Sequence, residues 1–243
     1  MTNPITYRTA LEIAYHEAII RQAYKDSVGV WTWSVGLTSA TGHDVQRYKD
    51  NPQTMEHCLA IYVWALNNYA DAVRKAFAGT PLTEAQFAAA LSFHWNTGSI
   101  SKASWVGMFK SGRLVDAEVS FKTWNKADGK VSKGLVTRRA QEADLLFRGK
   151  WSADGTINEY TRLTASYTPV WSSAKRVNIE AALRSALGDE QPLGPGAEPT
   201  PAPPNPGSGD QSRPREPAPP GRTRATIMAE LRSLLAELET LEN

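Results

Sequence analysis

The stretch EIAYHEAIIRQAYKDSVGVWTWSVGLT, residues 12–38, changes its hydrophobic period half-way along and thereby decides the fold. In its first half Ile13, Glu17 and Ile20 lie three or four positions apart, which is the spacing of one helix face and predicts a helix over residues 9–24. Glu17 would lie on the inward face of this helix. Because an ionised carboxylate is rarely buried without a partner, a glutamate in that place is unusual.

In the second half the apolar residues alternate with small ones, which predicts a strand over residues 30–37 with two unlike faces. The large side chains would fill one face. The other face, which includes Thr32 and Ser34, is small and partly polar. Such a face suits a surface that leaves room for a ligand.

Three side chains of this stretch have the chemistry of glycoside hydrolysis. Asp26 lies in the turn nine positions after Glu17, and Thr32 follows six positions later. A helix, a turn and a returning strand can bring all three to the mouth of one cleft. Hydrolysis of a glycosidic bond needs one protonated carboxyl group, which donates to the leaving oxygen, and one ionised carboxylate, which acts on a water or on the sugar cation.

The spacing E-x8-D-x5-T, with Tyr24 two positions before the aspartate, resembles the phage-type lysozymes of glycoside hydrolase family 24, which include endolysins of tailed bacteriophages. The resemblance assigns the family's Glu-Asp-Thr triad to Glu17, Asp26 and Thr32. One segment departs from the family, because T-x-G-x-G-H reads TWSVGL at residues 32–37. We interpret the missing histidine as a structural change, since the triad is complete.

Two later strings are also similar to family segments and follow in the expected order. They are ALSFHWNTG at residues 90–98 and GLVTRRAQE at residues 134–142, so the resemblance covers roughly residues 8–149. We expect His94, within the first string, to be a core histidine rather than a ligand.

A basic residue beside the cleft would balance Glu17 while leaving it able to take a proton. Arg139 is the preferred partner and Arg138 the second choice, and either could instead belong to a solvated helix face. Trp124 precedes a loop rich in Lys, Asp and Gly, which is expected to edge the cleft.

The resemblance implies an α+β, mostly helical, lysozyme-like fold with two lobes. A small β-sheet would belong to the N-terminal lobe, and a long amphipathic helix, beginning near Pro52 and ending before Gly79, would join the lobes. We expect four parts. They are a catalytic domain over residues 1–149, a small extension packed on it over 150–187, a Pro-rich linker over 188–222 and an amphipathic helix over 223–243.

The implied activity is hydrolysis of the β-1,4 bond between N-acetylmuramic acid and N-acetylglucosamine in bacterial peptidoglycan. Glu17 would be the general acid, Asp26 would activate water or stabilise developing positive charge, and Thr32 would help to place the water. The family resemblance suggests inversion at the sugar carbon.

The nearest alternative is a lytic transglycosylase, which needs one glutamate and no water. The presence of Asp26 and Thr32 argues against it. Another is a virion-associated structural or binding protein with a lysozyme-like body.

The composition weighs against several other classes of function. Residues 1–187 are basic, which favours an anionic polymer such as the cell wall, but no nucleic-acid motif is present. Cys58 is the only cysteine, so an intrachain disulfide is excluded and a buried, apolar role is expected. No cluster has the spacing of metal ligands, so no metal and no cofactor is expected.

The sequence also bears on location. No run of about 18 apolar residues and no signal segment is found, so we expect no stable membrane insertion. A lysis enzyme of this kind would accumulate in the host cytoplasm and reach the wall through a separate hole-forming protein.

The C-terminal segment has its own pattern. Its apolar residues recur at spacings of four and three, as in the seam of a short coiled coil, at Ile227, Leu231, Leu234, Leu238 and Leu241. The same segment carries too many glutamates to attack a membrane as a cationic helix. It therefore predicts self-association or docking on a partner.

Overall fold

The fold is built around β1 (Ala18–Lys25), the middle strand of a five-stranded sheet with the order β3-β2-β1-β6-β7. The computed structural model describes residues 4–27, 29–127 and 129–188. β1 pairs antiparallel with β2 (Trp31–Ser34) and parallel with β6 (Thr156–Tyr160). β3 (Leu37–Thr38) and β7 (Ala174–Asn178) form the two edges. Strands from both ends of the described chain therefore meet in one sheet.

The helices form the rest of the molecule, and the model confirms a mixed α+β, mostly helical fold. They are α1 (Tyr7–His16), α2 (Met55–Ala76), α3 (Glu84–Thr97), α4 (Ser104–Lys110), α5 (Leu114–Lys122), α6 (Lys133–Arg148) and α7 (Glu180–Leu187). Short 3-10 turns span Ser39–Thr41, Val45–Tyr48 and Trp171–Ser173, and β4 (Lys126–Ala127) pairs with β5 (Lys130–Val131) in a small hairpin. Of the helices in the described ranges, none combines the length and apolar character that crossing a membrane requires.

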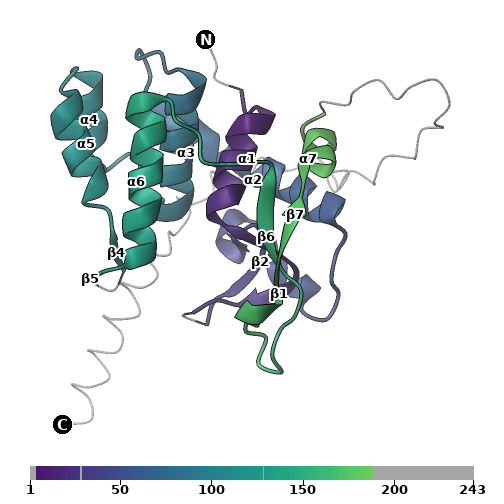
Figure 1. The fold of residues 1–243 in the computed structure, drawn as a ribbon. Helices are drawn as coiled ribbons and strands as arrows, with labels where there is room; N and C mark the ends of the chain where they lie inside the picture. The colour runs from purple at the N-terminus through teal and green to yellow at the C-terminus, as the bar shows by residue number, and fades with distance from the viewer. Residues whose placement is uncertain (1–3, 28, 128, 189–243) are drawn as a thin grey trace, which may run out of the picture.

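Figure 1 shows the two lobes: α3, α4, α5 and α6 lie on one side and the sheet on the other, with α1 between them. α2 comes after β3 in the chain and leads into α3, which packs on α6. A capping box, in which Thr83 and Gln86 satisfy each other's backbone N–H groups, begins α3. The expected long inter-lobe helix is thus present as α2, and it begins with Thr54 as its N-cap.

The helix predicted over residues 9–24 is wrong in its second half. α1 ends at His16, and Glu17 is its C-cap with an extended backbone, so Glu17 does not lie on an inward helix face. Residues 18–25 form β1 instead, because β2 and β6 take up its backbone hydrogen bonds from both sides. A strand covered on both faces has apolar residues in succession, here Ile19 and Ile20, and such a run also fits a helix period.

The strand predicted over residues 30–37 is interrupted. Ser34 and Gly36 have φ angles of 54° and 78°, in the left-handed region, and the chain folds back there so that Trp33 pairs with Leu37. The alternation continues across the turn, with Trp33, Val35 and Leu37 all buried in the core.

Residues 150–188 extend the sheet and are tied to α1 by a buried carboxylate. Glu12 is fully buried and accepts hydrogen bonds from the backbone N–H groups of Ser152 and Ala153 at 2.9–3.1 Å. Burial raises the pKa of Glu12, but these bonds and His16, at 3.6 Å, outweigh it, so that the pKa lies below its ordinary value. α7 packs on α1 and α2. The predicted linker and heptad helix lie outside the described residues.

Candidate functional site

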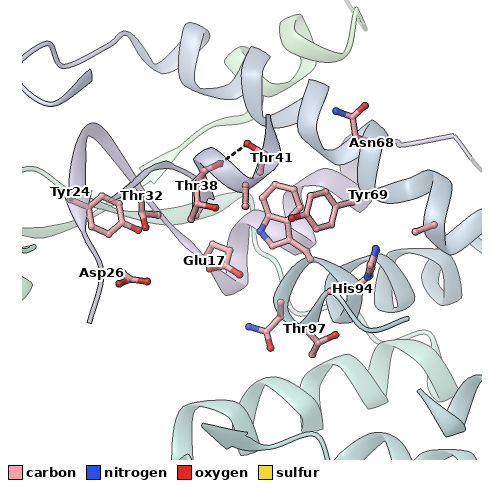
Figure 2. A pocket seen from close by; sticks show the side chains of 16 residues that line it. Glu17, Tyr24, Asp26, Thr32, Thr38, Thr41, Asn68, Tyr69, His94 and Thr97 are labelled. Atoms are coloured by element: carbon pink, nitrogen blue, oxygen red, sulfur yellow. Dashed lines mark hydrogen bonds between the residues drawn. The ribbon is translucent and has the colours of Figure 1, made fainter. Parts of the chain in front are cut away.

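A cleft with a volume of about 540 Å³ lies between the sheet and the helices. Glu17, Tyr24, Asp26, Thr32 and Gly36 line it from the sheet lobe, and α2 and α3 contribute Asn68, Tyr69, His94 and Trp95. In Figure 2 the Glu17 side chain lies between the group Tyr24, Asp26 and Thr32 and the group Tyr69, His94 and Thr97. The three residues of the predicted triad thus share one cleft.

Glu17 is placed by the junction of α1 and β1. Its side chain is 23% exposed, and its Oε1 accepts a hydrogen bond of 2.6 Å from Nη1 of Arg138 on α6. The carboxylate therefore reaches the cleft from the sheet lobe, while its cationic partner comes from the helical lobe.

Arg138 is held by a second carboxylate behind it. Its Nε donates to Oε1 of Glu142, one helical turn on, at 2.9 Å, and Glu142 is fully buried. Burial acts to lower the pKa of Arg138, but the charges of Glu17 and Glu142 outweigh it, so that the pKa is raised. Ser92 on α3 also donates to Glu142 at 2.6 Å. The guanidinium is therefore charged and fixed in orientation.

The preferred choice of Arg139 as the partner of Glu17 is wrong, because Arg138 occupies that place. Arg139 is fully buried and donates from Nη2 to Oε1 of Glu142 and to Oδ1 of Asn96, both at 3.0 Å. Burial lowers its pKa to about 10 although Glu142 counteracts the effect. Adjacent helix residues point about 100° apart, so only one of the two arginines can face the cleft.

Gly36 lies directly beside the Glu17 carboxylate, so a side chain at this position would contact it. A Cβ built on Gly36 would lie 3.4 Å from Oε2 of Glu17 and 3.9 Å from Nε1 of Trp95. The φ angle of +78° also favours glycine at this position. This glycine thus keeps the space in front of the carboxylate open.

Asp26 and Thr32 are positioned by the connection between β1 and β2. Oδ1 of Asp26 accepts a hydrogen bond from the backbone N–H of Val30 at 2.9 Å. The hydroxyl of Thr32 donates to the backbone carbonyl of Val30 at 3.1 Å, and the residue is 4% exposed while lining the cleft. The side chains of both residues are therefore anchored on one backbone unit.

Two further predicted site residues do not line the cleft. Ser34 is buried, and its hydroxyl donates to the carbonyl of Cys58 at 2.9 Å. Cys58 is buried as expected, and burial raises its pKa to about 12. Trp124 packs edge-on against Phe93 in the helical core. Ser34 therefore ties β2 to α2, and Trp124 packs within the helical lobe.

The helical wall of the cleft contains residues that the sequence did not single out as functional. Tyr69 and Trp95 contact each other with ring centroids 4.9 Å apart, and Asn68 lies beside them. Helical spacing marks Tyr69 as a core residue, and a half-buried aromatic on a cleft wall has the same spacing as a buried one. In the described ranges no group of His, Cys, Asp and Glu residues has a geometry that could hold a metal ion.

The comparisons with known proteins agree with this geometry. A family model described as phage lysozyme matches residues 14–142, more than half of the chain. The chain belongs to the phage lysozyme family.

Individual relatives cover smaller parts. An endolysin of Bacillus phage PZA is 40% identical over 83 residues, 33% of this chain and 32% of the relative, and an endolysin of Bacillus phage B103 is 37% identical over 71 residues. The chain thus spans about a third of the length of these curated relatives.

Solved structures extend the likeness to the fold. The endolysin from Escherichia coli O157:H7 phage FAHEc1 has a TM-score of 0.55 and 25% identity, covering 61% of this chain and 96% of that one. The muramidase domain of SpmX from Asticaccaulis excentricus has a TM-score of 0.51 and 24% identity, covering 60% and 98%. The lysozyme-like fold expected from the sequence is confirmed.

His94 generates a prediction about pH. It was expected in the core, but it lines the cleft half-buried, with its ring 5.3 Å from that of Tyr69, and burial lowers its pKa to about 4. An unfolded histidine binds a proton below about pH 6.5, whereas folded His94 does so only near pH 4, so acidification through this window favours unfolding. We expect His94 alone to reduce the free energy of unfolding by about 2 kcal/mol between pH 6.5 and 4.

Urea denaturation at a series of pH values measures this effect. His94→Gln should lose about 2 kcal/mol less than the wild type over the same interval. Parallel pH dependences of the two proteins would contradict the assignment.

Proposed function

We propose that the chain is an endolysin that hydrolyses the β-1,4 bond between N-acetylmuramic acid and N-acetylglucosamine in peptidoglycan. The observation that carries the proposal is the meeting of Glu17, Asp26 and Thr32 at one cleft, with Glu17 paired to a fixed arginine. The family membership and the endolysin relatives support it.

In the proposed mechanism Glu17, protonated, donates to the leaving glycosidic oxygen. Asp26, ionised, draws a water toward the sugar carbon, and the Thr32 hydroxyl orients that water. Glu142 balances one of the two charges of Arg138 and Arg139, and the carboxylate that Glu17 becomes as it gives up its proton balances the other, so the cluster behind the cleft loses its excess positive charge as the sugar cation develops.

The cleft walls suit a glycan. Tyr24 on the sheet side and Tyr69 and Trp95 on the helical side offer aromatic surface to the apolar faces of sugar rings, and Asn68 and Thr97 offer hydrogen bonds to hydroxyl and acetamido groups. A role in phage-induced lysis, by release of the protein through a separate hole-forming protein, is part of the same proposal.

The proposal predicts that Glu17→Gln lowers the turnover rate by about three orders of magnitude without unfolding the protein, because the amide has the shape of the carboxylic acid but no acidic proton to donate. The measurement is mass spectrometry of muropeptides released from purified peptidoglycan. Wild type should release fragments ending in reducing muramic acid. Glu180→Gln, at an exposed glutamate on α7, is the matched control and should keep full activity.

Other products would assign another function. Anhydromuramic acid from the wild type would indicate a lytic transglycosylase. Equal product release by wild type and Glu17→Gln would remove Glu17 from the mechanism, and no release by either would contradict the enzymatic proposal.

Two glycine variants distinguish the effect of a methyl group beside Glu17 from the effect of backbone strain. Gly36 and Gly112 have φ angles of +78° and +77°, but only at Gly36 would a new methyl group meet Glu17, whereas Gly112 has open space. Both substitutions to alanine should cost about 1 kcal/mol of folding free energy. Only Gly36→Ala should lower kcat on peptidoglycan, by about tenfold, because its methyl group would occupy cleft space directly against the Glu17 carboxylate. Equal activities of the two variants would contradict the role given to Gly36.

A further inference from the structure

The extension after residue 150 sends one loop back to the hairpin that carries Asp26 and Thr32. This loop, residues 161–170, joins β6 to the turn before β7, and Tyr167 lies near its tip. The backbone N–H of Lys25, immediately before Asp26, donates to the carbonyl of Tyr167 at 2.8 Å. The ring of Tyr167 packs edge-on against Trp31, immediately before Thr32, with centroids 5.2 Å apart. One residue therefore contacts both ends of the β1–β2 connection.

Tyr167 is held in an unfavourable backbone conformation to make these contacts. Its φ angle of 63° lies in the left-handed region, which a tyrosine rarely adopts. The loop fixes it by a hydrogen bond from its N–H to the carbonyl of Thr164 and one from the N–H of Thr164 to the carbonyl of Thr168, both of 2.9 Å. A strained non-glycine residue in a well-bonded loop indicates that its placement matters.

The side chain of Tyr167 is fixed as well. Its hydroxyl donates to Oδ1 of Asp50 at 2.7 Å, and Nζ of Lys49 lies 4.9 Å from the centre of its ring. Nζ of Lys25 lies 5.4 Å from the centre of the Trp31 ring. Each of the two aromatic rings, which pack on each other, therefore also has a cation beside it. The contact between the extension and the hairpin is thus specific in both backbone and side chain.

The position of this contact relative to the cleft explains what it can do. Lys25 and Trp31 alternate along their strands with Tyr24 and Thr32, which line the cleft, so they point to the opposite face of the hairpin. Tyr167 therefore supports the hairpin from behind and does not touch the cleft.

We propose that Tyr167 is a positioning residue, which braces the β1–β2 connection so that Asp26 and Thr32 hold the attacking water in place. The proposal rests on the lysozyme function proposed above and deepens it, because it makes residues 161–170 part of the machinery of turnover. These residues lie outside the part of the chain that the family model matches.

The test uses three variants of the full chain. Tyr167→Gly removes the ring and accepts the left-handed backbone without strain, so kcat on soluble peptidoglycan fragments should fall about tenfold to a hundredfold at unchanged KM. Tyr167→Phe keeps the ring against Trp31 and should retain kcat within about twofold. Trp171→Ala is the matched control, since Trp171 is 70% exposed at the base of the same loop and packs on Tyr160; its kcat should stay at the wild-type value.

Hydrogen exchange gives a readout that is independent of turnover. The Lys25 amide, which is bonded to Tyr167, should exchange faster in Tyr167→Gly than in wild type, and Trp171→Ala should leave it unchanged. If the wild type releases no sugar fragments, the proposed function fails while the exchange experiment still decides whether Tyr167 braces the hairpin.

Three results would overturn the inference. One is wild-type kcat in Tyr167→Gly. The second is an equal loss of kcat in Trp171→Ala, which would indicate general destabilisation. The third is a raised KM at unchanged kcat, which would make Tyr167 a substrate contact rather than a brace.

Discussion

The arrangement of the cleft depends on the ion pair between Glu17 and Arg138. A guanidinium as buried as that of Arg138 is tolerated only where carboxylates compensate it, because desolvating an unpaired charge costs several kcal/mol. Glu17 supplies one carboxylate from the α1–β1 junction and Glu142 the other from α6 itself. The pair therefore joins the two lobes at the point where the chemistry is proposed to occur, and it orients the Glu17 carboxylate at the same time.

The two lobes contribute different things to the site. The helical lobe supplies charge and an aromatic wall, whereas the sheet supplies the hairpin on which Asp26 and Thr32 are anchored. That hairpin is one half of a sheet whose other half, β6 and β7, comes from residues beyond 150. Its geometry consequently depends on a segment that the family resemblance does not cover, and the buried carboxylate of Glu12 ties that segment to α1.

Much of the fold could be predicted from the sequence, and so could the position of Glu17, Asp26 and Thr32 at one cleft. The predictions that were wrong have physical causes. α2 has a clear N-cap and one-sided apolar periodicity, so its bounds were predicted closely. Residues 18–24 were assigned to a helix because Ile19 and Ile20 are buried on opposite faces of the strand, so the start of β1 lacks alternation. The pairing of β1 with β6 spans about 140 residues, and no local pattern encodes it. The choice between Arg138 and Arg139 depended on the rotation of α6 about its axis, which sequence spacing does not determine to within one residue.

The most direct test of the account is a double-mutant cycle on Glu17 and Arg138, measured as free energies of unfolding. Arg138→Met and Glu17→Gln each remove one charge of the pair, so each should cost about 2 to 3 kcal/mol. The double variant leaves Glu142 paired with Arg139, so it should cost less than the sum, with a coupling energy of at least about 1 kcal/mol. Single-variant costs below about 1 kcal/mol that add in the double variant would contradict the claim that this ion pair holds the site together.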